Sequence, residues 1–435
     1  MADDPNAMIQ DWFRQAVHAV EPERAVRHRL SVESTHVTVG DIAISVAGRI
    51  WIAAVGKAAV GMARGAVGVF GPRVAGGVVI TKDGHVDGNL PDSLSVYEAS
   101  HPIPDERGVA ATRAMLAMVE AAGPDDLVLA LISGGGSALL EAPRPPVTLH
   151  DMARTTELLL RAGAPIGDLN TVRTPLSLVK GGGLRRAGAS TSFSTLLLSD
   201  VLGNDPTVIA SGPTVPSDSG KDAALDVMAR YGLTSRAPES VIRVLTDDRQ
   251  TRMVTIPADE PVIVVGDNAI AVAEMRRAAE KANFSVNVAW VGAEGEAAVL
   301  GRAWFDACEA ADTDIDVLIG GGEATVTVRG DGVGGRNTEF ALAAAISMED
   351  AGDQGWVIAS LATDGQDGPT GVAGAIADGS TIARARAAGV DAHEALRQND
   401  SLRVFEAAGG VVRTGPTGTN VNDIYVAVRR RIRDG

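Results

Sequence analysis

The chain has a single cysteine, Cys308, which excludes a disulfide-stabilised scaffold and a zinc site built on cysteines. No apolar run approaches the roughly 18 residues of a transmembrane helix, so we expect no membrane span. Residues 1–5 are acidic and lack the apolar core of a signal peptide. Together these absences predict a cytoplasmic protein.

Positive charge is scarce, and lysine is especially rare. Lys and Arg number 39 against 55 Asp and Glu, a net charge of −16 at pH 7. Bulk electrostatics therefore disfavour nucleic-acid and anionic-membrane partners, and an anionic small substrate needs a local cationic pocket. The lysines are Lys57, Lys82, Lys180, Lys221 and Lys281. The first three stand beside glycines, which makes them functional candidates.

The order of apolar segments predicts the fold of the first half of the chain. A length of 435 residues suggests two or three domains, and we favour two. We expect strands at 50–55, 77–81, 94–98, 127–132 and 195–199, with helices at 58–69 and 106–121. Continuously apolar strands that alternate with helices predict a doubly wound α/β domain with a mostly parallel sheet.

A polar segment at 246–252, followed by Pro257 and Pro261, marks the expected domain boundary. We place the two domains at residues 1–250 and 255–435. In the second domain we expect strands at 262–265, 286–291, 317–319, 325–329 and 357–362. Helices are expected at 269–282, 294–311 and 337–347. This pattern predicts a second α/β domain.

Glycine, by contrast, is abundant, with 50 residues, and the glycine-rich segments follow apolar strands. In open α/β sheets ligands bind outside the carboxyl ends of the strands. Lys57 lies in a strand-to-helix turn, where it adds positive charge to an anion site. We expect phosphate binding at Ser133-Gly134-Gly135-Gly136-Ser137. The spacing of a Walker loop is absent from the chain.

Four charged side chains in or beside polar segments are further candidates. Arg173 can hold a carboxylate or phosphate with two hydrogen bonds. Lys180 precedes an apparent helix start, and pairing with a carboxylate is its alternative role. Asp200 falls just past a buried strand, a common place for a carboxylate that holds Mg²⁺ or accepts a proton. Arg336 follows a glycine run at a helix start, where it can stabilise charge on a transferring phosphoryl group.

Two segments late in the chain complete the candidate site. Asp364 and Asp367 lie in a glycine-rich loop after strand 357–362 and suit a hard cation or a substrate hydroxyl. A turn that uses Asp and Gly for local backbone reasons is the alternative. The polar segment 414–423 contains Asn422 and is placed to close over the same site.

Some apparent signals are discounted. Gly330, Gly332 and Gly335 fit the dinucleotide pattern G-x-G-x-x-G, but Asp350, 20 residues beyond Gly330, ends the following helix instead of the next strand. His85 and His101 lack a partner at metal-ligand spacing, so a structural role is expected for both. No G-x-S-x-G elbow is present, which argues against a hydrolase triad.

Taken together, these segments resemble the class II glycerate kinase (glycerate 2-kinase) family, whose C-terminal part is the MOFRL domain. The matching segments include 55–59, 81–85, 101–105, 133–139, 170–173, 180–182, 198–216, 321–323, 334–337, 363–369 and 417–423. The resemblance implies two α/β domains, the first Rossmann-like and the second a MOFRL-like mixed sheet, with the active site in the cleft between them. It also implies ATP- and Mg²⁺-dependent transfer of the γ-phosphoryl group to the 2-hydroxyl of D-glycerate.

Lys57 and Arg336 match the family's proposed catalytic pair. We therefore assign these two residues to the transferring phosphoryl group, and residues 133–137 with Lys180 to the nucleotide phosphates. Asp200, a third catalytic candidate, or Asp364 would hold Mg²⁺ or orient the substrate hydroxyl. The acid substrate would be bound by Arg173, which takes its carboxylate, together with Asp364, Asp367 and Asn422.

The chain departs from the family pattern at Asp83, where Tyr is usual, and at Gly183, where Arg is common. These changes leave open which acid is phosphorylated. The alternatives are a kinase of another small sugar acid, an NAD(P)H-dependent hydroxypyruvate reductase and a non-catalytic sensor of an anionic metabolite. Beyond the small-molecule substrate we expect no nucleic-acid or membrane partner, and a homodimer is left open.

Overall fold

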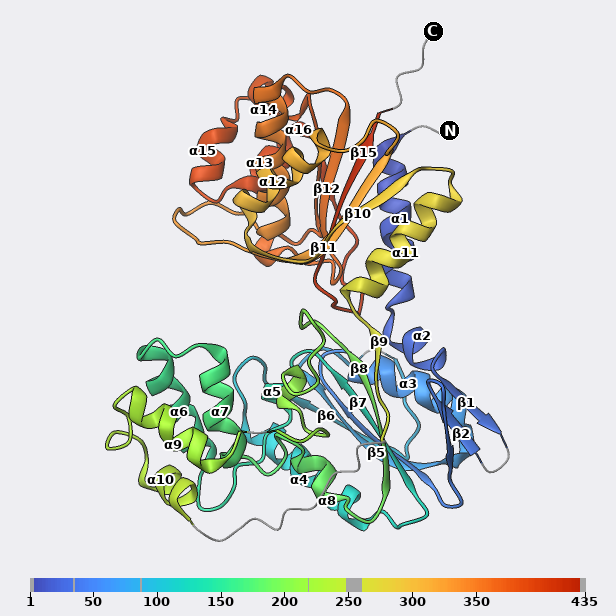
Figure 1. The fold of residues 1–435 in the computed structure, drawn as a ribbon, viewed down its shortest axis with the longest axis vertical. Helices are drawn as coiled ribbons and strands as arrows, with labels where there is room; N and C mark the ends of the chain where they lie inside the picture. The colour runs from blue at the N-terminus through green and yellow to red at the C-terminus, as the bar shows by residue number, and fades with distance from the viewer. Residues whose placement is uncertain (1–3, 34–35, 87, 218, 248–259, 431–435) are drawn as a thin grey trace. The chain divides into compact units, whose positions relative to one another are not determined.

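The computed structural model describes residues 4–33, 36–86, 88–217, 219–247 and 260–430. The chain forms two compact units, which Figure 1 colours along the sequence. The first unit is Pro22–Val265, and in the second unit Met1–Glu21 joins Gly266–Gly435. Most of the polar segment that suggested the boundary lies outside the described residues.

This division differs from the predicted 1–250 and 255–435 at both ends of the first unit. Helix α1 (Pro5–Ala19) packs against helix α11 (Asn268–Lys281) of the second unit. The Trp12 and Phe284 rings meet edge to face at 5.3 Å between centroids. Strand β9 (Val262–Gly266) pairs into the first unit's sheet instead of opening the second domain. Side-chain packing between distant segments therefore sets the boundary.

The first unit is built on a six-stranded sheet with the order β6-β5-β4-β7-β8-β9. The strands are β4 (Ile50–Val55), β5 (Val74–Lys82), β6 (Leu94–Ala99), β7 (Leu127–Ser133), β8 (Ser192–Leu198) and β9. The pairs β6–β5, β5–β4, β4–β7 and β7–β8 are all parallel. The chain leaves β4 toward one edge and returns to its other side at β7, which confirms the predicted Rossmann-like arrangement.

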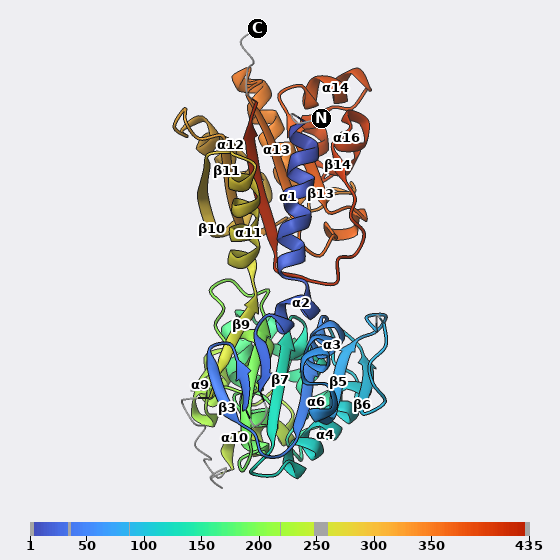
Figure 2. The same cartoon turned by 90° about the vertical axis from the view of Figure 1, so that its right-hand side faces the viewer.

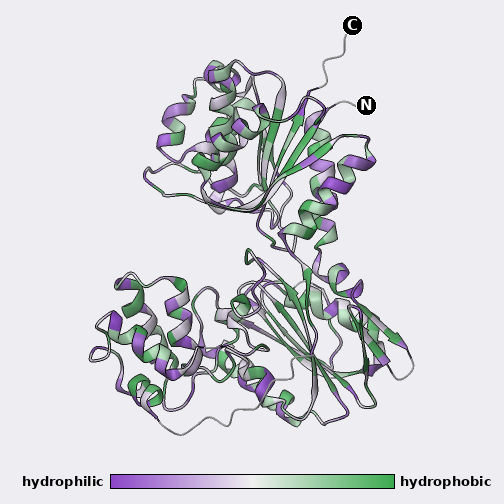
Figure 3. Ribbon diagram, in the orientation of Figure 1, coloured by the Kyte–Doolittle hydropathy of each residue, from purple (hydrophilic) through white to green (hydrophobic). Residues whose placement is uncertain are grey.

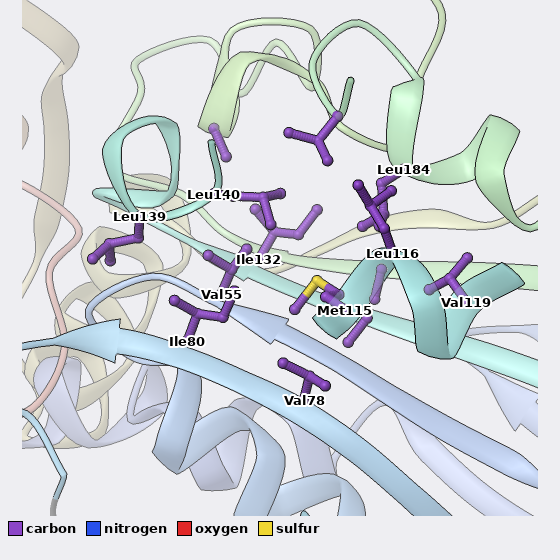
Figure 4. Packing of buried hydrophobic residues seen from close by; sticks show 14 of the residues in the cluster. Val55, Val78, Ile80, Met115, Leu116, Val119, Ile132, Leu139, Leu140 and Leu184 are labelled. Carbon is purple, nitrogen blue, oxygen red and sulfur yellow. The ribbon is translucent and has the colours of Figure 1, made fainter. Parts of the chain in front are cut away.

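The sheet is held by apolar residues from strands and helices alike. Every residue of β7 is buried, as expected of a strand covered on both faces. Helix α4 (Glu106–Ala121) is capped by Asp105, whose side chain accepts a hydrogen bond from Gly108 N. Figure 4 shows Met115 and Val119 of α4 packed over strand residues such as Ile132. Helix α3 (Ala59–Phe70) follows β4 directly.

Two parts of the first unit were not expected from the sequence. The helices α6 (Leu149–Arg161), α7 (Ile166–Leu176), α9 (Lys221–Arg230) and α10 (Glu239–Thr246) enclose an apolar cluster of their own. Strands β1 (Leu30–Glu33), β2 (His36–Val39) and β3 (Ile42–Ser45) form an antiparallel sheet after α2 (Pro22–Arg27). The short helices α5 (Gly136–Leu139) and α8 (Gly183–Ala187) follow glycine-rich turns.

The second unit contains a mixed sheet with the order β10-β11-β15-β12-β13-β14, as predicted. Its strands are β10 (Val286–Glu296), β11 (Val317–Thr325), β12 (Trp356–Ala362), β13 (Gly374–Asp378), β14 (Val411–Val412) and β15 (Asp423–Arg429). β10 and β11 are parallel, and the other pairs are antiparallel. The expected helix 294–311 begins later, at Ala297, because residues 294–296 extend β10. The strand expected at 325–329 is absent, since β11 ends at Thr325.

Helices cover both faces of this second sheet. On one face lie α12 (Ala297–Glu309), α13 (Arg336–Ala351), α14 (Thr381–Ala387), α15 (Ala392–Arg397) and α16 (Ser401–Ala408). Helices α1 and α11 lie on the other face, as Figure 2 shows. Figure 3 shows many hydrophobic residues in the strands and a mixture of hydrophobic and hydrophilic residues in the helices. Among the described helices, none has the length and apolar character needed to cross a membrane.

Candidate active site

Polar side chains gather at the carboxyl edge of the first unit's sheet. Lys57 follows β4, Lys82 ends β5, and His101 follows β6. Ser133 ends β7, and Asp200 follows β8. Parallel strands end at the same edge of a sheet, which is where ligands bind in folds of this kind. Five separate loops thus deliver their side chains to one place.

Backbone contacts fix the two central loops to each other. Lys57 N donates a hydrogen bond of 2.9 Å to Gly134 O, and Ala58 N donates one of 3.1 Å to Ser133 Oγ. Gly56 has a left-handed φ of +119°, and a Cβ there would stand 2.2 Å from Ser133 Oγ. Only glycine allows this close approach, so the turn that carries Lys57 has a defined position against the loop after β7.

Three side chains border the backbone of Gly134 and Gly135. A Cβ on Gly134 would stand 2.1 Å from Asp200 Oδ2. Gly135 adopts a left-handed φ of +83°, and its Cβ position lies 3.2 Å from His101 Nε2 and 3.3 Å from Lys57 Cγ. The glycines therefore leave the room in which a carboxylate, an imidazole and a lysine approach one another.

The charges of these groups influence one another. Burial raises the pKa of the Asp200 carboxyl, while the Lys57 ammonium acts in the opposite direction. Burial lowers the pKa of His101, and the charges of Lys57, Lys82 and His85 lower it further. Both effects favour the neutral imidazole over the charged form. The sequence assigned structural roles to His85 and His101, but their places beside Lys57 depend on the pairing of β4, β5 and β6.

The predicted residues Lys180 and Arg173 contact the protein's own backbone. Lys180 is 1% exposed, and its Nζ donates to Ser137 O at 2.7 Å, to which Arg173 Nη2 also donates at 3.3 Å. Glu141 Oε2 lies 3.4 Å from Lys180 Nζ and 3.7 Å from Arg173 Nη2. Ser137 Oγ is hydrogen-bonded to Ser211 Oγ at 2.7 Å.

This geometry changes the reading of two predicted site residues. The sequence assigned Lys180 to the nucleotide phosphates, but its ammonium is buried and engaged, so the structure corrects this to a contact that positions the loop. The nearby carboxylate of Glu141 is the kind of partner that the sequence left open for Lys180. Arg173 contacts the same carbonyl, and its predicted hold on the substrate carboxylate remains a prediction.

Replacing Lys180 by methionine is expected to destabilise the first unit by about 3 kcal/mol, because the buried Glu141 loses its nearer countercharge and keeps only Arg173 Nη2 at 3.7 Å. Burial already lowers the pKa of Lys180 to about 8, in spite of the attraction of Glu141. Urea unfolding measures the loss. The double variant Lys180→Met/Glu141→Gln should regain more than half of it. A single variant as stable as the wild type would contradict this interpretation.

The second unit presents one arginine held in a fixed orientation. Arg336 opens α13, where its Nε donates to Asp423 Oδ2 at 2.6 Å and its Nη2 to Asp423 Oδ1 at 2.8 Å. Asp423 is 0% exposed, and Asn337 Nδ2 also donates to its Oδ1 at 2.9 Å. Nη1 takes no part in this pair, and the predicted action of Arg336 on a phosphoryl group stays a prediction. Sequence reasoning gave Asp423 no role, although it ends the polar segment directly before an apolar strand.

Asp367 is not free to bind a substrate. Its Oδ1 accepts a hydrogen bond from Asn337 N at 2.8 Å. Its Oδ2 accepts hydrogen bonds from Thr338 N and Thr338 Oγ1, both at 2.8 Å. The side chain is 0% exposed. The predicted substrate contact is therefore corrected to a cap on the first turn of α13, which fixes the helix that carries Arg336.

Asp364 and Asn422 lie on neighbouring loops of the second unit. The Asp364 carboxylate accepts a hydrogen bond from Gln366 N at 2.9 Å, and its charge helps to raise the pKa of Arg336. Asn422 has a left-handed φ of 66°, and its carbonyl accepts hydrogen bonds from Thr363 N and Thr363 Oγ1. Asp364 therefore lies near Arg336, and its predicted contact with substrate or metal stays a prediction. The contact of Asn422 with substrate stays a prediction.

The two proposed metal ligands, Asp200 and Asp364, belong to different units. The described residues contain no group of three or more His, Cys, Asp or Glu side chains that could hold a metal. Mg²⁺ usually needs only one or two carboxylates, because substrate phosphates and water complete its shell. The partly buried Asp200 carboxylate beside the glycine loop fits that requirement.

Other parts of the protein occupy the space beside the glycines of the discounted dinucleotide pattern. A Cβ on Gly330 would stand 2.5 Å from Gln398 O, and one on Gly332 would stand 2.4 Å from Asp400 Cβ. The loop with these glycines begins several residues after the end of β11. That strand belongs to the mixed sheet of the second unit and not to the parallel sheet of the first. This packing leaves no room for a pyrophosphate at these glycines.

The two departures from the family pattern have local explanations. Asp83 is exposed and forms two hydrogen bonds of 2.7 Å with Arg107, which neutralise its charge. A Cβ on Gly183 would stand 2.1 Å from Leu178 O, so this position requires glycine. Neither residue adds a free charge to the site.

Comparisons with known proteins agree with these observations. The family model described as "Domain of unknown function (DUF4147)" matches residues 8–246, and the MOFRL family model matches residues 316–423. The D-glycerate 2-kinase of Thermotoga maritima is 38% identical over 434 residues, which cover 98% of this chain and 99% of that protein. An Agrobacterium vitis protein with the provisional name hydroxypyruvate reductase is 39% identical, over 96% of this chain and 93% of its own length.

Similarity to a solved structure extends over almost the whole chain. The crystal structure of glycerate kinase from Thermotoga maritima has a TM-score of 0.87 and 36% sequence identity. It covers 98% of this chain and 99% of its own. On these matches, the chain belongs to the glycerate kinase family with a C-terminal MOFRL domain.

Proposed function

We propose that this chain is a glycerate 2-kinase, which transfers the γ-phosphoryl group of ATP to the 2-hydroxyl of D-glycerate. The observation that carries the proposal is the meeting of Lys57, Asp200 and the Gly134–Gly135 backbone at the carboxyl edge of a parallel sheet. Phosphoryl transfer needs positioned cations and backbone donors more than covalent chemistry, and this edge supplies both. The choice of D-glycerate as the substrate rests on the names of the related proteins.

In the proposed reaction an oxygen lone pair of the substrate's 2-hydroxyl forms the new bond to the γ-phosphorus. The bond between that phosphorus and the bridging oxygen breaks, and its electron pair leaves with ADP. Lys57 and Arg336 stabilise the negative charge on the transferring group. Backbone amides of residues 133–137 bind the nucleotide phosphates, while the Ser133 and Ser137 hydroxyls contact the protein itself. Lys180 holds that loop in place through its contact with Ser137 O.

Asp200 is the residue that would hold Mg²⁺. When bound, the ion neutralises charge on the nucleotide phosphates. The hydroxyl proton passes to solvent water when Asp200 holds the ion. When Asp200 does not hold it, its carboxylate can accept the proton, since burial raises its pKa. The same proposal places the enzyme in the cytoplasm, with a small-molecule substrate and no nucleic-acid or membrane partner. A homodimer stays a prediction, as does the cleft location of the site.

The proposal is tested by coupled ADP release with ATP, Mg²⁺ and a panel of small hydroxy acids. We expect the highest kcat/KM with D-glycerate. A signal with another acid and none with D-glycerate would refute the substrate but keep the kinase chemistry. Oxidation of NADH with hydroxypyruvate, and no ADP release with any acid, would support the reductase alternative and refute the proposal.

A further inference from the structure

Three half-buried basic side chains at the sheet edge have no hydrogen-bond or ion-pair partner within the described residues: Lys57, Lys82 and His101. Elsewhere the described basic groups are commonly paired, as Arg336 is with Asp423. With a net charge of −16, the chain has ample carboxylates to neutralise them. Their clustering without such partners indicates a site for an anionic ligand.

Two carboxylates on the Lys82 and His101 side of Lys57 are occupied by other groups, while Asp200 follows β8 on the other side. Asp83, the residue after Lys82, is paired with Arg107 at 2.7 Å. Glu98 at the end of β6 accepts a hydrogen bond from Gly84 N at 2.7 Å. Burial is the largest cause of the lowered pKa of His101. The positive charges around His101 lower this pKa further. An anion that enters here meets the positive charge of Lys82 and Lys57, which is offset only in part, by Asp200 beside Lys57.

The order of strands places this positive field beside the proposed phosphate site. Along the sheet edge the strands follow as β6, β5, β4, β7 and β8. His101 and Lys82 belong to the first two, Lys57 follows the third, and the glycine loop and Asp200 follow the last two. Neighbouring strands lie about 4.8 Å apart. Along the sheet edge, Lys57 thus lies between the basic residues Lys82 and His101 on one side and the glycine loop with Asp200, which suit phosphate and metal, on the other.

The chemistry of a 2-hydroxy acid matches this order. Its reacting hydroxyl is on the carbon next to the carboxylate, so the carboxylate must bind directly beside the transferring phosphoryl group. Lys82 is on the strand next to β4, and His101 Nε2 approaches the same point near Gly135 as Lys57 Cγ. Arg173, the residue first assigned to the carboxylate, already donates to Ser137 O.

We propose that Lys82 and His101 bind the carboxylate of the acid substrate, with Lys57 between this subsite and the transferring phosphoryl group. Lys82 supplies the positive charge, and His101 donates a ring N–H. The subsite would select an acid over a neutral polyol of similar size. This inference rests on the proposed kinase function and names the part of the site that recognises the acid.

The variants Lys82→Met and His101→Asn test the subsite. We expect each to raise the KM for D-glycerate about 10–100-fold, the value of a hydrogen bond to a charged group. kcat at saturating D-glycerate and the KM for ATP should stay within about fivefold of the wild type. The reason is that the lost contact binds the substrate and the transition state equally well, so its loss weakens binding but does not slow the chemical step. Calorimetric titration of D-glycerate without ATP should show the same loss of affinity.

Matched controls separate this role from a structural one. Lys281→Met on helix α11 and His150→Asn on helix α6 remove the same side-chain types at exposed positions and should leave the KM unchanged. Lys82→Arg should keep most of the affinity. Both test variants should also lose preference for D-glycerate over glycerol as phosphoryl acceptor.

Two results would overturn the inference. If the wild type phosphorylates D-glycerate and both variants keep its KM and its calorimetric affinity, the subsite is wrong while the kinase proposal stands. If the wild type does not phosphorylate D-glycerate or another acid, both proposals fail together.

Discussion

Replacing Lys57 by methionine is expected to lower kcat by about 10³-fold, with the free energy of unfolding nearly unchanged. Loss of a group that stabilises transition-state charge typically costs 10²–10³ in rate. The Lys57 side chain makes no ion pair within the described residues, so its removal breaks no direct contact, and the Asp200 carboxyl can take up a proton when the nearby charge is lost. Single-turnover phosphoryl transfer with saturating ATP and D-glycerate measures the effect.

The variant Lys57→Arg provides the matched control. It keeps the positive charge but cannot place it at the same point beside Gly135, and we expect it to recover only part of the lost rate. Circular dichroism and the urea midpoint should be the same for all three proteins. A Lys57→Met enzyme within about tenfold of the wild-type kcat would remove Lys57 from the reaction.

Replacing Arg336 by alanine is expected to lower kcat by about 10³-fold or more, the range found for arginines that act on a transferring phosphoryl group. This variant also leaves Asp423 unpaired in the interior, where it is 0% exposed. A loss of about 3–5 kcal/mol in stability should therefore accompany the loss of rate. Kinetics and urea unfolding must be measured on the same preparation.

A double variant separates the two effects. Arg336→Met/Asp423→Asn removes the unpaired charge, so stability should return while activity stays low. The single change Asp423→Asn keeps Arg336 but weakens the two hydrogen bonds that orient it. We expect a fall in kcat of about 10–100-fold there, with the KM for D-glycerate little changed. Recovery of activity in the double variant would contradict a direct role for Arg336.

The parts of the fold that could be predicted from the sequence are those set by local pattern. The apolar run of β7 and the turn at Gly56 and Lys57 each carry their signal within a few residues. The parallel sheet then follows from the alternation of strands and helices. Pairing between distant segments carries no such signal. The predicted boundaries therefore put β9 in the second domain and residues 5–19 in the first, whereas the structure has β9 in the first sheet and helix α1 in the second unit.

The same distinction explains the results for the site. Lys57, Asp200 and Arg336 stand at the ends or beginnings of predicted elements, so their positions could be anticipated. Lys180 and Asp367 also lie in glycine-rich segments, but their partners Glu141 and Asn337 are 39 and 30 residues away and turn them into buried structural groups. A motif locates a loop, while the partner of each side chain depends on the tertiary fold.

The most direct test of the central claim is to identify the product formed from ATP, Mg²⁺ and D-glycerate by ³¹P and ¹H NMR. The proposed function predicts one new phosphate monoester, coupled to the proton on carbon 2, and an equal amount of ADP. Phosphate on carbon 3, or no phosphoglycerate from an enzyme that is folded by circular dichroism, would contradict it.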